Sequence, residues 1–404
     1  MSDVYSEFSM LDLKHDPGHA PPSANSQRPG HVPGVGHTRT PADGQNDVRS
    51  PTFSAMGRAH PPFDLVDPDD QARLSDATFV LRSLTGLVVL DEKQMRPDLF
   101  ALLLVLAGRA NTPTRFLILD SAAPELLRKT SGSLAGKVTF HELDGLALDE
   151  LAPGQSDLRW LHGGFPRSYL ATDDRGSKAW REAFIRTYLE RDLPKLGINL
   201  PALTLRRFWT MLGHYHAQTW NASDLSRALG VSDKTVSRYL DILEGTFLTW
   251  RLRPRHTNQG KREVKAPKVY LADTGLLHSL LGITSESDLL AHPKCGASCE
   301  GFVLHEIIRV TGAGRDEAFF WALHSGAELD LLVMRNGPRL GFEVKLTRSP
   351  KITPSMRAAQ KALGLDHLYV VCHGDGPVQP LSEGINAVPL QALDSLNLPN
   401  VFEH

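Results

Sequence analysis

The apolar residues of the N-terminal half form two short, continuous runs. Gly86–Leu90 and Arg115–Leu119 each contain four consecutive apolar side chains, which is typical of strands buried on both faces of a sheet. Apolar residues at helical spacing separate the two runs over Arg96–Arg109, and Pro124–Lys129 begins a further helix. This order of strand, helix, strand and helix predicts an α/β fold with a parallel sheet.

The middle of the chain has the pattern of helices. Over residues 177–193 the apolar positions recur every three to four residues, which predicts a long amphipathic helix. Between residues 221 and 247, two short helical patterns lie on either side of Gly230, as in a helix-turn-helix. Phe247–Arg253 alternates like a strand, and Val269–Leu271 predicts a second strand after a basic loop. The order of these elements is that of a winged helix-turn-helix.

The C-terminal region returns to strand patterns. Phe302–Ile308 predicts a helix, and Glu328–Val333 and Gly341–Leu346 predict two strands. A turn at Asn336-Gly337-Pro338 would make these strands antiparallel neighbours. We therefore divide the chain into a disordered low-complexity segment (residues 1–60), an α/β core (61–160), a helical region with the winged helix-turn-helix (161–275) and a second α/β domain (276–404).

The composition of the 404 residues is that of an ordinary globular protein. Hydrophobic residues make up 41% and charged residues 22%, and the absence of a run of about 18 apolar residues predicts no membrane span. Asp3 and Glu7 lie where a secretory signal would carry positive charge, so we expect a cytoplasmic protein. The net charge of -2 argues against nucleic-acid binding by the whole surface, but it allows a local basic patch.

Two acids directly follow the first predicted strand. Asp91 and Glu92 would lie at the carboxyl end of this strand, where doubly wound sheets bind their ligands. Acids in this position hold Mg²⁺ and orient water in enzymes that hydrolyse nucleotides. The alternative is an ordinary buried strand that ends in a polar loop, because an acidic pair is a weak pattern by itself.

A second set of charged residues lies in the C-terminal region. Alternation places Glu343 and Lys345 on one face of their strand, and the predicted turn would bring Asp330 beside them. Glu300 lies at the start of the helical pattern that precedes both strands. An acid, a second acid and a lysine two residues later match the PD-(D/E)xK pattern of nucleases. The alternative is an exposed hairpin that carries a solvated Glu–Lys pair.

The helix-turn-helix and the basic loop contain residues suited to DNA contacts. Ser232 can cap the second helix, which leaves polar side chains on the outer face near its start, where recognition helices touch a groove. Those residues are Lys234, Thr235, Ser237 and Arg238. The basic loop, suited to phosphate contacts, adds Arg253, Arg255, Lys261 and Arg262. DNA is therefore a candidate partner, and the alternative is a module that only packs between the neighbouring domains.

A series of ordered motifs links these regions. In chain order the motifs cover Leu84–Leu99, Phe116–Leu127, Ser133–Gly136, Gly163–Pro166, Glu190–Asp192, Lys265–Lys268, Asp273–Leu276 and Glu328–Asp330. Over roughly residues 63 to 400 the chain resembles the bacterial and archaeal AAA-type ATPases whose core is followed by a domain of unknown function. The resemblance implies an incomplete P-loop (AAA-like) parallel sheet, a winged helix-turn-helix and a C-terminal restriction-endonuclease-like α/β domain.

For the N-terminal core, the resemblance implies ATP and Mg²⁺ as cofactors. Asp91 would bind Mg²⁺, Glu92 would orient the attacking water, and Ser121 would contact the γ-phosphate. An arginine finger from a neighbouring subunit would require a homo-oligomer. The chain departs from the family because no Gly-x-x-x-x-Gly-Lys-[Ser/Thr] occurs in its 404 residues. The backbone N–H groups and the lysine that hold a triphosphate are therefore missing, and Asp120 and Lys93 replace residues that are usual in the family.

For the C-terminal domain, the resemblance implies a second Mg²⁺ site. Asp330 and Glu343 would bind the ion through oxygen, Lys345 would position the attacking water, and Glu300 would complete the acidic cluster. We therefore expect an AAA-type ATP-binding homologue that is impaired in ATP hydrolysis and carries DNA-binding and nuclease-like modules. The alternatives are a Mg²⁺-dependent nuclease with a vestigial ATPase half and a non-catalytic DNA-binding protein.

The low-complexity segment also carries an expectation. In the family, the phosphate-binding loop lies a few tens of residues before Phe63, which places it inside residues 1–60 of this chain. We therefore expect this segment to be a replaced or frame-shifted N-terminus. Translation of the upstream DNA in the other two reading frames tests the idea, because one frame should encode a strand followed by the missing loop.

Overall fold

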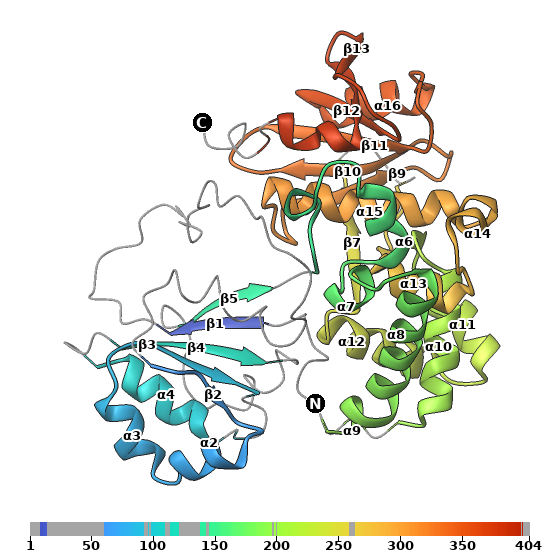
Figure 1. Ribbon diagram of the computed structural model, residues 1–404. Coiled ribbons are helices and arrows are strands. Elements are labelled where there is room, and N and C mark those ends of the chain that lie inside the picture. Colours follow the sequence, from blue (N-terminus) through green and yellow to red (C-terminus); the bar gives the residue numbers. More distant parts are fainter. Residues whose placement is uncertain are drawn as a thin grey trace. The chain divides into compact units, whose positions relative to one another are not determined.

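The computed structural model describes two compact units, Met1–Leu143 and Asp144–His404 (Figure 1). The described residues are 9–13, 60–92, 96, 98–109, 114–120, 138–142, 145–195, 198, 200–257, 263–396 and 398. The division falls before the boundary predicted after residue 160, and no division follows residue 275. In this described part of the chain, no helix is both long enough and apolar enough to cross a membrane.

The N-terminal unit contains a five-stranded sheet in the order β2-β3-β4-β1-β5. Strands β2, β3 and β4 are parallel, so the predicted parallel arrangement of the two apolar runs is confirmed. The strands are β2 (Phe63–Asp64), β3 (Gly86–Asp91), β4 (Thr114–Asp120), β1 (Ser9–Leu13) and β5 (Val138–Glu142). The helices in the described part of this unit are α2 (Pro68–Arg73), α3 (Ala77–Ser83) and α4 (Leu99–Ala107), and the helix predicted from Pro124 to Lys129 lies outside the described residues. Helix α4 lies between β3 and β4 in the sequence, as predicted, and its leucines pack into the buried core with α3 and the strands.

Strand β1 corrects the prediction that residues 1–60 lack structure. It is antiparallel to both of its neighbours, with Leu11 opposite Ile118 of β4 and Phe140 of β5. Three of its five residues are apolar, and a position between two strands supplies backbone hydrogen bonds on both sides. The prediction was made from the composition of the whole segment, which does not reveal a short apolar stretch within it. Residues 1–8 and 14–59 lie outside the described residues.

The C-terminal unit begins with a helical half. Its main helices are α6 (Ser156–His162), α7 (Pro166–Tyr169), α8 (Asp174–Thr187), α10 (Ala202–His214), α11 (Ala222–Leu229), α12 (Asp233–Gly245) and α13 (Thr274–Leu281). Three shorter helical elements are η2 (Leu148–Glu150), η3 (Tyr188–Asp192) and α9 (Leu193–Lys195). The predicted amphipathic helix corresponds to α8, which continues into the π-helical turn η3. Its Phe184 and Tyr188 rings pack in a row between Phe165, which precedes α7, and Trp209 of α10.

A nine-stranded mixed sheet runs through the unit in the order β13-β14-β12-β11-β10-β9-β7-β8-β6. The strands are β6 (Gln218–Thr219), β7 (Thr249–Pro254), β8 (Lys268–Leu271), β9 (Ala318–Ala322), β10 (Glu328–Met334), β11 (Arg339–Lys345), β12 (His367–Cys372), β13 (Gln379–Ser382) and β14 (Ile385–Pro389). Strands β10 and β11 are antiparallel, as predicted, and the turn between them uses positive φ angles at Asn336 and Gly337. Strands β11, β12 and β14 are parallel.

Helices cover both faces of the central strands. The helices of this half are α14 (Glu286–Ala291), α15 (Cys295–Thr311), α16 (Pro354–Leu363) and the short η4 (Leu390–Leu396). Phe302 and Ile307 of α15 share one buried cluster with Phe342 of β11. Met356 of α16 and Leu332 of β10 belong to a separate cluster. The strands with the predicted acids therefore lie between two apolar layers, and Figure 1 shows α15 beside β10.

Two glycine-containing segments pack against each other where β8 ends. A Cβ atom on Gly275 would overlap the carbonyl oxygen of His162, and one on Gly163 would overlap the carboxylate of Asp273. The Asp273 carboxylate accepts hydrogen bonds from the N–H groups of Gly164 at 2.7 Å and Leu276 at 2.8 Å. The second bond caps helix α13. Gly163, Gly164, Asp273 and Gly275 are called the glycine junction below.

Candidate functional site

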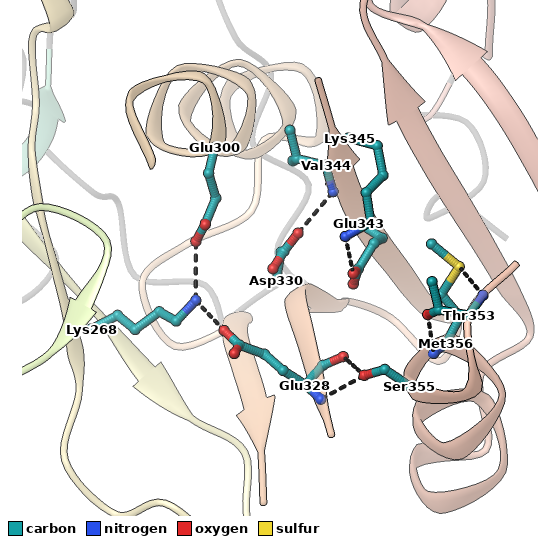
Figure 2. A network of polar contacts seen from close by, with 10 residues as sticks. All are labelled: Lys268, Glu300, Glu328, Asp330, Glu343, Val344, Lys345, Thr353, Ser355 and Met356. Atoms are coloured by element: carbon teal, nitrogen blue, oxygen red, sulfur yellow. Dashed lines mark hydrogen bonds and ion pairs between the residues drawn. The ribbon is translucent and has the colours of Figure 1, made fainter. Parts of the chain in front are cut away.

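Strands β10 and β11 bring Asp330, Glu343 and Lys345 together. The antiparallel register pairs Leu331 with Phe342, so the next positions carry Asp330 and Glu343. The N–H group of Val344 donates to Asp330 Oδ2 at 2.8 Å, and Lys345 Nζ donates to Glu343 Oε1 at 2.7 Å (Figure 2). The turn between the strands thus places the three predicted residues side by side, as the sequence analysis expected.

One oxygen in this group is buried without a partner. Glu343 is only 5% exposed, and among the described residues its Oε2 atom has no hydrogen-bond partner. Burial raises the pKa of the Glu343 carboxyl. Burial also raises the pKa of Asp330, and the nearby carboxylates of Glu300 and Glu343 raise that pKa further. A buried carboxylate oxygen is costly unless a proton, a donor or a cation satisfies it.

Glu300 lies on α15 and is held by residues that the sequence analysis did not assign to the site. Its Oε1 atom accepts hydrogen bonds from Lys268 Nζ at 3.0 Å and from the Tyr270 hydroxyl at 2.7 Å. The Lys268 ammonium also contacts Glu328 at the start of β10 (Figure 2). Glu328 had a local signal, since it precedes Asp330 by two residues on the same strand. Lys268 and Tyr270 had none, because only the sheet places β8 near α15.

The group of charged residues is defined here as the acid cluster: Glu300, Glu328, Asp330, Glu343, Lys268 and Lys345. Burial acts to lower the pKa of Lys268, but the carboxylates of Glu300, Asp330 and Glu328 outweigh it and raise that pKa. Burial likewise acts to lower the pKa of Lys345, but the carboxylate of Glu343 outweighs it, so that the pKa of Lys345 is raised. Both lysines therefore carry positive charge at neutral pH.

The arrangement fits a single Mg²⁺ better than a closed metal cage. In the described part of the chain, no three His, Cys, Asp or Glu side chains are grouped so that they could hold a metal ion. Lys268 and Tyr270 both hold Oε1 of Glu300, whereas Oε2 of Glu343, on the strand beside Asp330, has no hydrogen-bond partner among the described residues. Mg²⁺ commonly binds through one or two protein carboxylates and completes its shell with water and substrate phosphate. These two residues therefore fit the ion that the sequence analysis expected there.

The acids of the N-terminal unit occupy the predicted position. Asp91 and Glu92 are buried at the carboxyl end of β3, beside the parallel strands β2 and β4. The N–H group of Glu92 donates to Asp91 Oδ1 at 2.9 Å, and Glu92 has a positive φ of 55°. A left-handed backbone is unusual for a glutamate and is found at functional sites. Ser121 and Lys93 lie outside the described residues.

The predicted helix-turn-helix is formed by α11 and α12. Gly230 ends α11 in the left-handed conformation, and Ser232 caps α12 by accepting the N–H group of Thr235 at 3.1 Å. Lys234 and Arg238 are exposed on α12, whereas Thr235 and Ser237 are half-buried. The Thr235 hydroxyl is also hydrogen-bonded to Ser232. Lys234 and Arg238 are therefore the residues of this set that are open to a partner.

The basic loop begins at a strand that belongs to the large sheet. Strand β7 pairs with β8 as in a wing, but it also pairs in parallel with β9, where Arg253 is opposite Phe319. Arg253 forms an ion pair with Asp316 at 3.0 Å, and Arg255 lies over the ring of Phe319. The start of the basic loop is thus hydrogen-bonded into the large sheet of the unit. Lys261 and Arg262 lie outside the described residues.

Comparisons with known proteins place the unit in families without an assigned activity. Residues 155–287 match a family described as a domain of unknown function (DUF8612), and residues 295–393 match another described in the same way (DUF4143). The chain is 45% identical over 327 residues to the uncharacterized protein Rv2008c of Mycobacterium tuberculosis and to the uncharacterized protein Mb2031c of Mycobacterium bovis. Each match covers 81% of this chain and 74% of the relative. No solved structure gives a significant match.

Proposed function

The chain belongs to the same family as these mycobacterial proteins. From the geometry of the acid cluster, we propose that its C-terminal unit is a DNA-binding, Mg²⁺-dependent phosphodiesterase of the PD-(D/E)xK nuclease type. One observation carries the proposal. Asp330 and Glu343 are buried side by side on antiparallel strands, Lys345 is bonded to one Glu343 oxygen, and the other oxygen has no partner among the described residues. Two carboxylates and a lysine in this order are what the sequence pattern requires.

Each residue of the site has a separate role in this proposal. Asp330 and Glu343 hold the ion, and the N–H group of Val344 fixes the orientation of Asp330. When bound there, Mg²⁺ would supply Lewis-acid chemistry for a phosphoryl oxygen and would lower the pKa of a water molecule. The Lys345 ammonium uses one donor on Glu343, and 36% of its side chain is exposed. Its two other donors are therefore available to orient water or to stabilise charge on a phosphoryl oxygen.

Cleavage of duplex and single-stranded DNA by the full chain tests this proposal. We expect cleavage to require Mg²⁺ or Mn²⁺ and to fall by roughly 100-fold or more in Asp330→Asn and in Lys345→Met, because each removes an essential charge. Glu383→Gln is the matched control, since it removes an exposed carboxylate from the turn between β13 and β14. Equal cleavage by all four proteins, or none by the wild type with either ion, contradicts the proposal.

The helix-turn-helix supports DNA as the substrate. Its capped helix α12 exposes Lys234 and Arg238 near its start, where recognition helices contact DNA. We expect duplex DNA to bind in a salt-sensitive way. Lys234→Ala combined with Arg238→Ala should lower the slope of log K against log salt by about two, because two phosphate contacts are lost. Fluorescence anisotropy measures the slope, and Lys361→Ala, an exposed lysine on α16, is the control.

The N-terminal unit supports a second function, which is weak nucleotide binding without hydrolysis. Asp91 and Glu92 lie at the carboxyl edge of parallel strands, where such sheets bind ligands. The 404 residues contain no Gly-x-x-x-x-Gly-Lys-[Ser/Thr] to hold a triphosphate. Isothermal titration with ATP and Mg²⁺ should therefore give no binding tighter than about micromolar. Tighter binding or ATP hydrolysis contradicts this part of the proposal.

A further inference from the structure

We propose that the Lys268 ammonium occupies the place of a second cation in the acid cluster, so that the site accepts one divalent ion and not two. This inference rests on the proposed phosphodiesterase function and concerns the same site. It assigns a positioning role to a residue that comes from the winged helix-turn-helix. Strands β10 and β11, which carry Asp330, Glu343 and Lys345, do not themselves provide this lysine.

The position of Lys268 is fixed by the sheet. Its backbone pairs with Leu252 of β7 on one side and Thr219 of β6 on the other. The side chain is 7% exposed, and its ammonium lies 3.0 Å from Glu300 Oε1 and contacts Glu328. The ammonium also lies over the ring of Phe320, with Nζ 5.6 Å from the ring centroid. A buried ammonium in such contacts cannot leave without exposing unpaired carboxylates.

The charges of the acid cluster balance with one divalent ion. Four carboxylates face two ammonium groups, which leaves two negative charges when all groups are ionised. One Mg²⁺ neutralises these charges, whereas two such ions would leave a buried excess of positive charge. The charge count therefore favours a single ion while Lys268 is present.

The oxygens available for ligation lead to the same conclusion. In two-metal sites the ions lie about 3.5–4 Å apart and share a cluster of carboxylates. Here one oxygen of Glu300 and one oxygen of Glu328 are bonded to Lys268. Only the Asp330 and Glu343 side remains, where Glu343 Oε2 is buried and unpartnered among the described residues. The single ion is therefore placed at Asp330 and Glu343.

The stoichiometry of Mn²⁺ binding by the full chain tests the inference, with electron paramagnetic resonance of free Mn²⁺ as the readout. We expect one ion for the wild type and for Lys268→Arg, which retains the positive charge. We expect two ions for Lys268→Met, in which Glu300 and Glu328 become free to bind. Lys361→Met, on the exposed surface of α16, should bind one ion like the wild type.

Each outcome decides between the two proposals. A single ion in a folded Lys268→Met protein, or two ions in the wild type, overturns the inference and leaves the proposed function intact. Absence of Mn²⁺ binding by the wild type overturns the proposed function itself. Circular dichroism establishes folding of each variant. If Lys268→Met does not fold, Lys268→Gln replaces it, because the amide removes the charge and keeps a donor toward Glu300.

Discussion

Two buried acids of the C-terminal unit, Asp273 and Glu343, differ in how their oxygens are satisfied. Each is 5% exposed. Both oxygens of Asp273 accept backbone N–H groups, from Gly164 and Leu276. One oxygen of Glu343 accepts a hydrogen bond from Lys345, and the other has no hydrogen-bond partner among the described residues. Burial alone therefore does not distinguish the two acids, whereas the hydrogen bonding of each oxygen does.

The two regions should consequently respond to mutation in opposite ways. Changes at the glycine junction should lower stability and leave ion binding unchanged, whereas changes at Asp330 or Glu343 should abolish ion binding at little cost in stability. All six tryptophans, Trp160, Trp180, Trp209, Trp220, Trp250 and Trp321, lie in the C-terminal unit. Urea unfolding followed by tryptophan fluorescence therefore reports on the stability of this unit.

The largest effect is expected for Gly275→Ala. The added methyl group would overlap the carbonyl oxygen of His162, and backbone atoms cannot move aside as a flexible side chain can. We expect the free energy of unfolding to fall by about 3 kcal/mol or more. The control is Gly296→Ala in α15, where nothing lies near the new Cβ atom and a gain of about 0.5–1 kcal/mol is expected. A loss below about 1 kcal/mol for Gly275→Ala would refute close packing at the junction.

A smaller loss is expected for Asp273→Asn. The amide nitrogen of asparagine cannot accept a hydrogen bond, so one of the two N–H groups, of Gly164 or of Leu276, loses its partner. We expect the unfolding free energy to fall by about 2 kcal/mol, with Mn²⁺ binding unchanged. If this variant keeps its stability and no longer binds Mn²⁺, the proposed difference between Asp273 and Glu343 is wrong.

The pH dependence of stability should come in part from His278, a buried residue of α13. Burial lowers the pKa of His278 to about 3, and the ring is hydrogen-bonded to Leu161 and Ser298. Above pH about 6.5 the imidazole is neutral in both the folded and unfolded states. Below that pH only the unfolded state gains a proton, so stability falls as the pH falls from about 6.5 toward 3.

The variant His278→Gln isolates this contribution. Over the same range the slope of unfolding free energy against pH should decrease by up to about 1.4 kcal/mol per pH unit relative to the wild type. His216, whose pKa burial also lowers to about 3, remains in the variant and should maintain part of the slope. Urea unfolding at pH 7.5, 6.5, 5.5 and 4.5 measures both slopes. Identical slopes in the two proteins would mean that folding does not lower the pKa of His278.

The smallest change in stability is expected for Asp330→Asn. Burial and the neighbouring carboxylates Glu300 and Glu343 disfavour the charged form of Asp330, and the asparagine oxygen can still accept the N–H group of Val344. We expect a gain of about 1 kcal/mol at neutral pH in the presence of a chelator, together with loss of Mn²⁺ binding. A large loss of stability would indicate that Asp330 is a structural acid like Asp273.

Local sequence patterns were sufficient for the elements that carry the candidate site. The alternation along β11 placed Glu343 and Lys345 on one face, and the turn at Asn336 and Gly337 made β10 an antiparallel neighbour. The cap at Ser232 and the left-handed Gly230 were similarly readable, because caps and turns depend on a few adjacent residues. Strand β1 could not be predicted, because a short apolar stretch becomes a strand only between strands that are distant in sequence.

The sequence by itself determined the order of the elements, the acidic and basic residues on each strand and the absence of a phosphate-binding loop from the 404 residues. Only the tertiary structure decided which charges meet. Lys268 and Glu300 are 32 residues apart on β8 and α15, and their contact exists because β7 joins β9 and so brings the wing into the large sheet. Local periodicity does not determine which strands pair. For that reason the place of Lys268 in the acid cluster could be seen only in the tertiary structure.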